Sequence, residues 1–101
     1  MTRPAPVVSI LCLTYNHETF IEQALCSFIS QKTDFNCEII VTDDASTDRT
    51  PSIVEQFQKS CNKSIKILRG DVNVGITRNF RRGLSACKGR YVALCEGDDY
   101  W

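Results

Sequence analysis

Residues 7–13 read Val7-Val8-Ser9-Ile10-Leu11-Cys12-Leu13, an almost continuous apolar run rich in β-branched side chains. Such a run is typical of a strand that is buried on both faces, as the strands of a parallel sheet are. Three more short apolar runs follow at residues 38–42, 64–68 and 91–95, and segments with helical spacing separate them. The resulting order, β-α-β-α-β-α-β, predicts an α/β fold with a mostly parallel sheet, right-handed crossovers and helices on both faces.

The three expected helices carry apolar residues at intervals of three and four, which is the pattern of an amphipathic helix. The first extends to about residue 31, the second begins at Thr50-Pro51, and the third covers residues 76–87. Thr50 before Pro51 predicts an N-cap followed by a proline in the first turn. The side chains expected to face the sheet are Phe20, Ile21, Leu25, Phe28, Ile29, Ile53, Val54, Phe57, Cys61, Phe80, Leu84 and Cys87.

Length and charge limit the possible classes of protein. A chain of 101 residues holds one small domain. Its 12 basic and 12 acidic side chains give a net charge of zero, which argues against nucleic acid as a partner, because such a partner selects a basic surface. No apolar stretch has transmembrane length, and the N-terminal run is interpreted as a strand and not as a signal peptide. We therefore expect a cytoplasmic protein, at the inner face of the membrane if its acceptor lies there.

The cysteines are even in number, but no two of them form a C-x-x-C pair. An even count in a short chain is also compatible with a disulfide scaffold. Because these cysteines fall in or beside strand-like and helix-like runs, we expect reduced, buried thiols that pack as small apolar side chains. The six residues are Cys12, Cys26, Cys37, Cys61, Cys87 and Cys95.

Carboxylates are grouped at the expected carboxyl ends of two strands. Glu96, Asp98 and Asp99 follow the last apolar run, and Asp43-Asp44 follows the second. Neighbouring carboxylates repel one another, and hard divalent metals with oxygen ligands relieve that repulsion. Ligands of open parallel sheets bind beyond the carboxyl ends of the strands. The two clusters predict one site for a metal and a phosphorylated ligand; the alternative is a set of turns with solvated acids.

The spacing of the three acids in the terminal cluster predicts which of their side chains point in the same direction. Glu96 and Asp98 are two residues apart, so both side chains point to the same side of an extended segment, whereas Asp99 points elsewhere unless the chain turns. One of the two can bind a metal while the other binds a ribose hydroxyl or a metal-bound water.

The first expected strand ends at Thr14-Tyr15-Asn16-His17, where a dinucleotide-binding fold would have a glycine-rich loop. That loop is absent, so the sequence gives little support to a nicotinamide cofactor. Tyr15 and Asn16 can instead offer a ring face and an amide to a nucleobase; the alternative is a turn in which Asn16 or His17 caps the first helix. Asp44 can accept hydrogen bonds from a base or a ribose, which we favour over a turn-forming role for the Asp43-Asp44 pair.

The start of the third expected helix supplies a cationic candidate. Gly75 indicates a tight backbone position there, and a helix start favours an anion. Arg78 can bind a diphosphate through its forked donors. The alternative is that Arg78, Arg81 and Arg82 form a solvated helix face, which is the interpretation we favour for Arg81 and Arg82.

Four stretches in order resemble family 2 glycosyltransferases of the GT-A fold: VSILCLTYN at 8–16, EIIVTDDASTD at 38–48, NVG at 73–75 and GRYVALCEGDD at 89–99. The resemblance covers nearly the whole chain. It implies a Rossmann-like half-domain that binds the nucleotide-sugar donor of an inverting, metal-dependent enzyme. The implied donor is a UDP-sugar, with a dTDP-sugar left open, and the implied acceptor is a polysaccharide or a lipid-linked glycan.

The same resemblance implies roles for individual residues. Thr14, Tyr15 and Asp44 would lie at the base and ribose, and Arg78 would approach the diphosphate. Glu96-Gly97-Asp98 would be the D-x-D element, in which Glu96 binds the ribose or the metal. Asp98 would ligate Mg²⁺ or Mn²⁺ directly, with Asp99 beside it.

The chain departs from the family pattern at two positions and in length. Leu13 replaces the usual proline, and Glu96 replaces the first aspartate of the triplet. In the family the catalytic base lies well downstream of the D-x-D element, so we expect the 101-residue polypeptide to bind donor but to transfer sugar feebly or not at all. The alternatives are a catalytically silent nucleotide-binding remnant and, less well matched, a receiver-type phospho-acceptor domain. An exposed sheet edge would favour self-association.

Overall fold

The computed structural model describes residues 6–30, 37–60 and 64–96 as an alternation of strands and helices. The strands are β1 (Val8–Thr14), β2 (Cys37–Asp43), β3 (Ser64–Arg69) and β4 (Tyr91–Glu96). The helices are α1 (Ile21–Ser30), α2 (Thr50–Ser60) and α3 (Ile76–Ala86). The predicted β-α-β-α-β-α-β order is confirmed, with each boundary within one or two residues of expectation.

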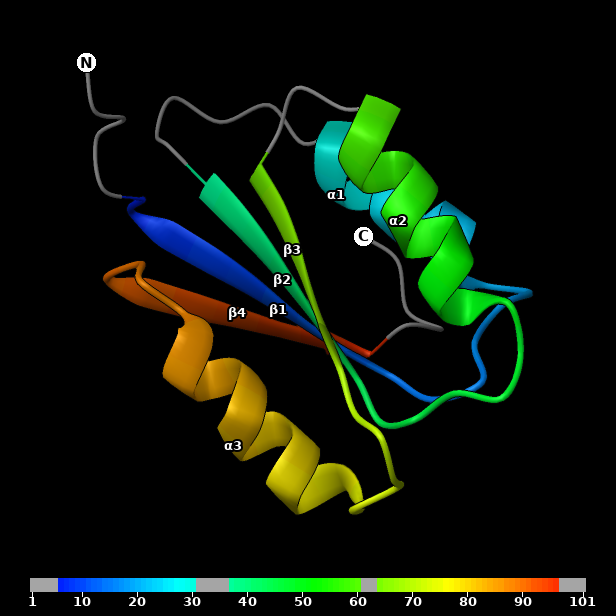
Figure 1. Cartoon of the computed structure of the whole chain (residues 1–101). Coiled ribbons are helices and arrows are strands. Elements are labelled where there is room, and N and C mark those ends of the chain that lie inside the picture. Colours follow the sequence, from blue (N-terminus) through cyan, green and yellow to red (C-terminus); the bar gives the residue numbers. More distant parts are fainter. Residues whose placement is uncertain (1–5, 31–36, 61–63, 97–101) are drawn as a thin grey trace.

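The four strands form one parallel sheet in the order β3-β2-β1-β4. Helices α1 and α2 cover one face and α3 covers the other, as predicted (Figure 1). The register pairs Thr14 with Asp43 and Leu13 with Glu96, so β1, β2 and β4 end at the same edge of the sheet. The loops that follow these strands therefore meet there.

Alternate residues of the strands fill two separate cores, because successive side chains of a strand point to opposite faces. The core under α1 and α2 includes Ile10, Cys12, Ile39 and Val41 from the strands. The core under α3 is smaller and is built on Leu11, Leu13 and Ile40, with Phe80, Ala86 and Cys87 packed against it.

One aromatic and one aliphatic side chain that were expected in these cores lie at the surface. Phe20 is 50% exposed because it precedes α1, whose buried stripe is filled by Ile21, Ala24, Leu25 and Phe28. Leu84 is 43% exposed because the line of α3 that faces the sheet runs through the polar Asn79 and the small Gly83. The buried line of α3 therefore lies one residue before the apolar residues Phe80 and Leu84 that were expected to form it. The side chains of Ile29 and Cys61 lie outside the described residues.

The cysteines are less uniformly buried than predicted. Cys12 and Cys95 are buried in the core, as expected. Cys26 is exposed because the side of α1 that packs on the sheet carries Ala24 and Leu25, and Cys26 lies on the other side of the helix. Cys26 and Cys87 are free thiols, and partial burial raises the pKa of the Cys87 thiol.

The outer strand β4 carries an apolar surface beside α3. Val92 is 41% exposed and Leu94 is 53% exposed, and their partners in β1 are Ser9 and Leu11. The sequence analysis did not specify which edge of the sheet is uncovered, and self-association through an edge stays a prediction. Within the described ranges, none of the helices combines the length and the apolar character needed to span a membrane.

Candidate functional site

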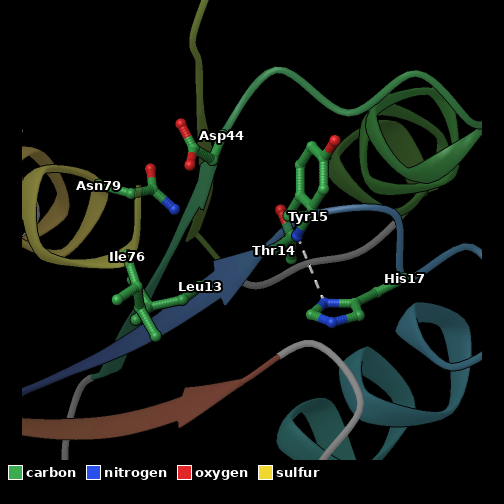
Figure 2. Close-up of a pocket in the computed structure, with 7 residues that line it drawn as sticks. All are labelled: Leu13, Thr14, Tyr15, His17, Asp44, Ile76 and Asn79. Carbon is green, nitrogen blue, oxygen red and sulfur yellow. Dashed lines mark hydrogen bonds between the residues drawn. The ribbon is translucent and has the colours of Figure 1, made fainter. Parts of the chain in front are cut away.

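The candidate site is a cavity of about 230 Å³ at the carboxyl edge of the sheet. It lies where the strand order reverses: the chain proceeds outward from β1 to β2 and β3 and then returns to β4 on the other side of β1. Crossovers leave from opposite faces at such a point, so the loops separate and open a crevice. The lining comes from the ends of β1 and β2 and the start of α3, and its members are Leu13, Thr14, Tyr15, His17, Asp44, Ile76 and Asn79 (Figure 2).

Asp44 connects this cavity to the loop between β3 and α3. It is 4% exposed, and its Oδ1 accepts a hydrogen bond from the Val74 N–H at 2.7 Å while its Oδ2 accepts one from the Gly75 N–H at 2.9 Å. Gly75 adopts φ +91°, a conformation that glycine tolerates best. Each carboxylate oxygen has more than one acceptor site, so both retain capacity for a ligand donor. Asp44 can therefore hold the loop and bind a ligand at once.

The adjacent Asp43 has a different role. It is 1% exposed, and its Oδ1 accepts hydrogen bonds from the hydroxyls of Thr14 (2.7 Å) and Ser46 (2.5 Å). Its Oδ2 accepts one from the Ser46 N–H at 2.9 Å. These bonds close the turn after β2, so the interpretation of both aspartates as ligand-binding groups is corrected for Asp43, which forms the turn.

The loops after β1 and β2 are joined by side chains. The Asn16 N–H donates to the Ser46 hydroxyl at 2.9 Å, and the Thr47 N–H donates to Asn16 Oδ1 at 2.8 Å. Asn16 has φ +53°, a conformation that asparagine adopts more readily than most residues. Of the two interpretations left open by the sequence, the structure supports a turn role for Asn16. It does not line the cavity, and a contact from Asn16 to a nucleobase stays a prediction.

Asp48 is the residue that caps α2, and not Thr50 as predicted. Asp48 Oδ1 accepts hydrogen bonds from the N–H (2.9 Å) and the hydroxyl (2.5 Å) of Thr50, and its Oδ2 accepts one from the Glu18 N–H at 3.1 Å. The Thr50 hydroxyl also accepts a hydrogen bond from the His17 N–H at 2.9 Å, in the loop between β1 and α1. Burial raises the pKa of Asp48, but the bonds from Thr50 and Glu18 outweigh it and hold that pKa below its ordinary value of 3.8.

A buried polar network supports the wall of the cavity formed by α3. Asn79, 2% exposed, donates from Nδ2 to the Thr42 carbonyl at 2.9 Å and accepts at Oδ1 from the Thr42 hydroxyl at 2.7 Å. Arg82 donates from Nη2 to Asn79 Oδ1 (2.6 Å) and to the Asp43 carbonyl (2.8 Å). The prediction that Arg82 lies on a solvated face is wrong: its guanidinium covers the end of β2, which leaves Arg81 as the exposed residue of the pair.

The remaining candidates lie around the rim or beyond it. Arg78 is exposed in the first turn of α3 and does not line the cavity. Glu96 ends β4, with its backbone paired to Leu13 of the cavity lining. Asp98 and Asp99 lie outside the described residues, and so does the side chain of Glu96. Among residues 6–30, 37–60 and 64–96, no three His, Cys, Asp or Glu side chains gather closely enough to hold a metal ion.

Four lining residues were not singled out from the sequence as ligand-binding candidates, and one of them, Leu13, was considered only as a strand residue in place of the usual proline. His17 was considered only as a helix cap, and Ile76 and Asn79 only as members of a helix. A polar residue such as Asn79 in a helical segment gives no local indication of burial, because its partner Thr42 lies 37 residues away. His17 could have been selected by its position alone, since it lies in the loop that follows the end of β1, where such crevices are lined.

A parallel sheet with helices on both faces and a crevice beyond the carboxyl ends of its strands defines the Rossmann-like class of ligand-binding α/β domains. The chain belongs to glycosyltransferase family 2: the family model described as "Glycosyl transferase family 2" matches residues 9–101. Its fold is that of the GT-A glycosyltransferases.

Named relatives and solved structures agree with this assignment. An uncharacterized protein of Mycobacterium tuberculosis is 44% identical over 93% of this chain and 27% of its own length. The putative teichuronic acid biosynthesis glycosyltransferase TuaG of Bacillus subtilis is 34% identical over 100% of this chain and 39% of its own length. The chain thus spans well under half the length of these curated relatives.

Two solved structures share the fold closely. Residues 1–349 of TarS from S. aureus, in a crystal structure with UDP-GlcNAc, superpose with a TM-score of 0.82 at 32% identity, over 92% of this chain and 27% of that one. The mannosyltransferase PcManGT from Pyrobaculum calidifontis, in complex with GDP-Man and Mn²⁺, gives a TM-score of 0.87 at 26% identity, over 97% of this chain and 29% of that one.

Proposed function

We propose that this chain binds the nucleotide-sugar donor of an inverting, metal-dependent glycosyltransferase. The donor is a UDP-sugar, and the acceptor is a polysaccharide or a lipid-linked glycan on the cytoplasmic side of the membrane. The single observation that carries the proposal is the cavity at the point of strand reversal, where Asp44 presents a buried carboxylate beside Thr14 and Tyr15.

The nucleoside half of the donor suits this cavity. Asp44 retains acceptor capacity on both carboxylate oxygens, which matches the N–H group of a pyrimidine base or a ribose hydroxyl. Tyr15 is 44% exposed, so its ring has a face available for stacking on a base. TarS with UDP-GlcNAc and PcManGT with GDP-Man support a nucleotide sugar as the ligand class.

The acids after β4 have the chemistry of a divalent-cation site. Mg²⁺ and Mn²⁺ prefer oxygen ligands, and Glu96, Asp98 and Asp99 supply carboxylates only. Glu96 ends β4 and is paired with Leu13 of the cavity lining, so this donor set begins at the ligand site. Asp98 and Asp99 would hold the metal, with Glu96 at the ribose or the metal. The metal would neutralise charge on the departing nucleoside diphosphate. The Mn²⁺ in the complex of PcManGT supports this assignment.

Sugar transfer also requires a base that removes the acceptor proton. The acids at this edge are assigned to the loop, the nucleotide and the metal, so we place the base and the acceptor contacts outside these 101 residues. TuaG, named for teichuronic acid biosynthesis, supports a polysaccharide acceptor.

Calorimetric titration of UDP into the purified chain tests the donor site. We expect binding with Mn²⁺ that weakens in EDTA and in Asp98→Ala. Tyr15→Ala should weaken binding roughly tenfold, because stacking of one base on an aromatic ring contributes about 1–3 kcal/mol.

Tyr91→Ala is the matched control, since Tyr91 is also exposed but begins β4 at the opposite edge of the sheet. Its affinity should equal that of the unmodified chain. A folded chain that does not bind UDP in Mn²⁺ would refute the proposal and identify a silent remnant.

A further inference from the structure

His17, the only histidine of the chain, is held in one orientation at the cavity. Its backbone N–H donates to the Thr50 hydroxyl at 2.9 Å, and its carbonyl accepts from the Phe20 and Ile21 N–H groups at 2.9 and 2.8 Å. Its ring Nδ1 accepts a hydrogen bond from the Tyr15 N–H at 3.4 Å (Figure 2). Three hydrogen bonds therefore hold the backbone of His17, and one long hydrogen bond orients its ring.

The bond from Tyr15 determines which ring nitrogen carries the proton. A neutral imidazole has one donor and one acceptor nitrogen, so an accepting Nδ1 places the proton on Nε2. Among the described residues, Nε2 has no hydrogen-bond partner. His17 thus presents an N–H donor at a cavity in which the carboxylate of Asp44 is an acceptor.

The position of His17 indicates which part of a ligand this donor would meet. Figure 2 shows Asp44 and His17 on opposite sides of Thr14 and Tyr15. Asp44 follows β2, whereas the acid-rich segment that begins at Glu96 follows β4, on the other side of β1. A nucleotide with its base at Asp44 and its metal-bound end near β4 must cross the end of β1. Its diphosphate then lies on the side of His17.

We infer that Nε2–H of His17 donates a hydrogen bond to a phosphate oxygen of the nucleoside diphosphate. The inference rests on the proposed function, because it requires a nucleotide in this cavity. A donor bond to an anionic oxygen is stronger than a bond between neutral groups, so its loss should be measurable as a lower affinity. The competing possibility is that His17 only stabilises the turn after β1 through Nδ1.

Two substitutions separate these roles, because asparagine and glutamine each reproduce one ring nitrogen. His17→Asn places an acceptor near Nδ1 and removes the distal donor. His17→Gln places a donor near Nε2 and removes the acceptor for Tyr15. We expect His17→Asn to bind UDP with Mn²⁺ roughly 10-fold to 100-fold more weakly, as for a lost hydrogen bond to a charged group. His17→Gln should retain most of the affinity.

Uridine provides the second measurement, since it lacks phosphate. An NMR titration, which reaches millimolar dissociation constants, should give the same uridine affinity for His17→Asn and the unmodified chain. Thermal unfolding of each variant establishes that the comparison is between folded proteins. Equal UDP affinity of His17→Asn and the unmodified chain would overturn the inference while the proposed function stands. An equal loss of affinity for uridine and for UDP in His17→Asn would also overturn the inference. An unmodified chain that binds neither ligand would instead refute the proposed function itself, and the inference with it.

Discussion

Two buried carboxylates lie at opposite edges of the sheet, and they use their oxygens differently. Glu38, 5% exposed at the amino edge, accepts hydrogen bonds from the Ser9 hydroxyl (2.5 Å) and the Lys88 N–H (2.6 Å), both at Oε2. Asp44, 4% exposed at the carboxyl edge, accepts one backbone N–H at each of its two oxygens. Asp44 lines the cavity at the carboxyl edge, whereas Glu38 does not belong to the lining of that cavity.

The difference shows that burial of an acid does not by itself identify a functional group. An amide can replace a carboxylate whose bonds all converge on one oxygen, because the amide keeps one acceptor. It cannot replace a carboxylate that accepts at both oxygens without turning an NH₂ group toward a donor. As far as the described residues contact it, Glu38 is therefore required for its shape and one acceptor, whereas Asp44 is required as a carboxylate.

The largest effect is expected from Glu38→Ala. The Ser9 hydroxyl and the Lys88 N–H would both lose their acceptor, which should lower the free energy of unfolding by about 2–4 kcal/mol. Glu38→Gln, the matched control, should stay within about 1 kcal/mol of the unmodified chain because it preserves the single acceptor. Urea denaturation measures both values. A loss of equal size in the two variants would show that the charge of Glu38, and not its geometry, is what the fold needs.

Asp44→Asn should give a smaller loss of stability and a loss of ligand binding. One of the N–H groups of Val74 and Gly75 would face an amide NH₂ group, so we expect a decrease of about 1–2 kcal/mol in the free energy of unfolding. UDP affinity in Mn²⁺, measured by calorimetry, should fall roughly tenfold or more, since the base loses a charged acceptor. Glu38→Gln should leave UDP affinity unchanged. If the two amide variants bound UDP equally well, the contrast between the two edges would be disproved.

The smallest effect concerns Asp48, a third carboxylate that binds N–H groups but is only partly buried. Its pKa in the folded state is below the ordinary value of 3.8, so its contribution to stability is present above that pH and disappears as the pH falls through the folded-state pKa. Asp48→Asn should be less stable than the unmodified chain by under about 1 kcal/mol at pH 6. Unfolding measured from pH 6 to pH 2 should show this difference shrinking below about pH 4. A constant difference across the range would exclude Asp48 ionisation as its source.

The sequence predicted the parts of this molecule that local patterns encode. The apolar runs located all four strands, because a strand buried on both faces has no polar alternation. Their alternation with helices located the carboxyl edge, and with it Asp44. What could not be predicted are contacts between distant segments. The bond from Arg82 to the Asp43 carbonyl joins residues 39 apart, and that from Thr42 to Asn79 joins residues 37 apart.

Adjacent residues were also hard to rank. Asp43 and Asp44 have the same chemistry and the same preceding strand, yet one closes a turn and the other lines the cavity. Thr50 is a residue type that often forms an N-cap, but Asp48 takes that role. The Thr50 hydroxyl instead accepts a hydrogen bond from the His17 N–H. In both cases, a neighbouring loop decides the outcome, and that loop comes from a different part of the chain.

The contact at Gly83 has a consequence for how this site can change over evolution. A Cβ at that position would overlap Leu11 Cδ1 and would lie 2.7 Å from Thr42 Cγ2, so α3 rests directly on the sheet there. Gly83 therefore sets the clearance between the helix and the strands, and one turn earlier the same helix presents Asn79 to the cavity. Any larger residue at position 83 would tilt or lift the helix and widen the crevice. Ligand preference could thus drift through a residue that never touches the ligand.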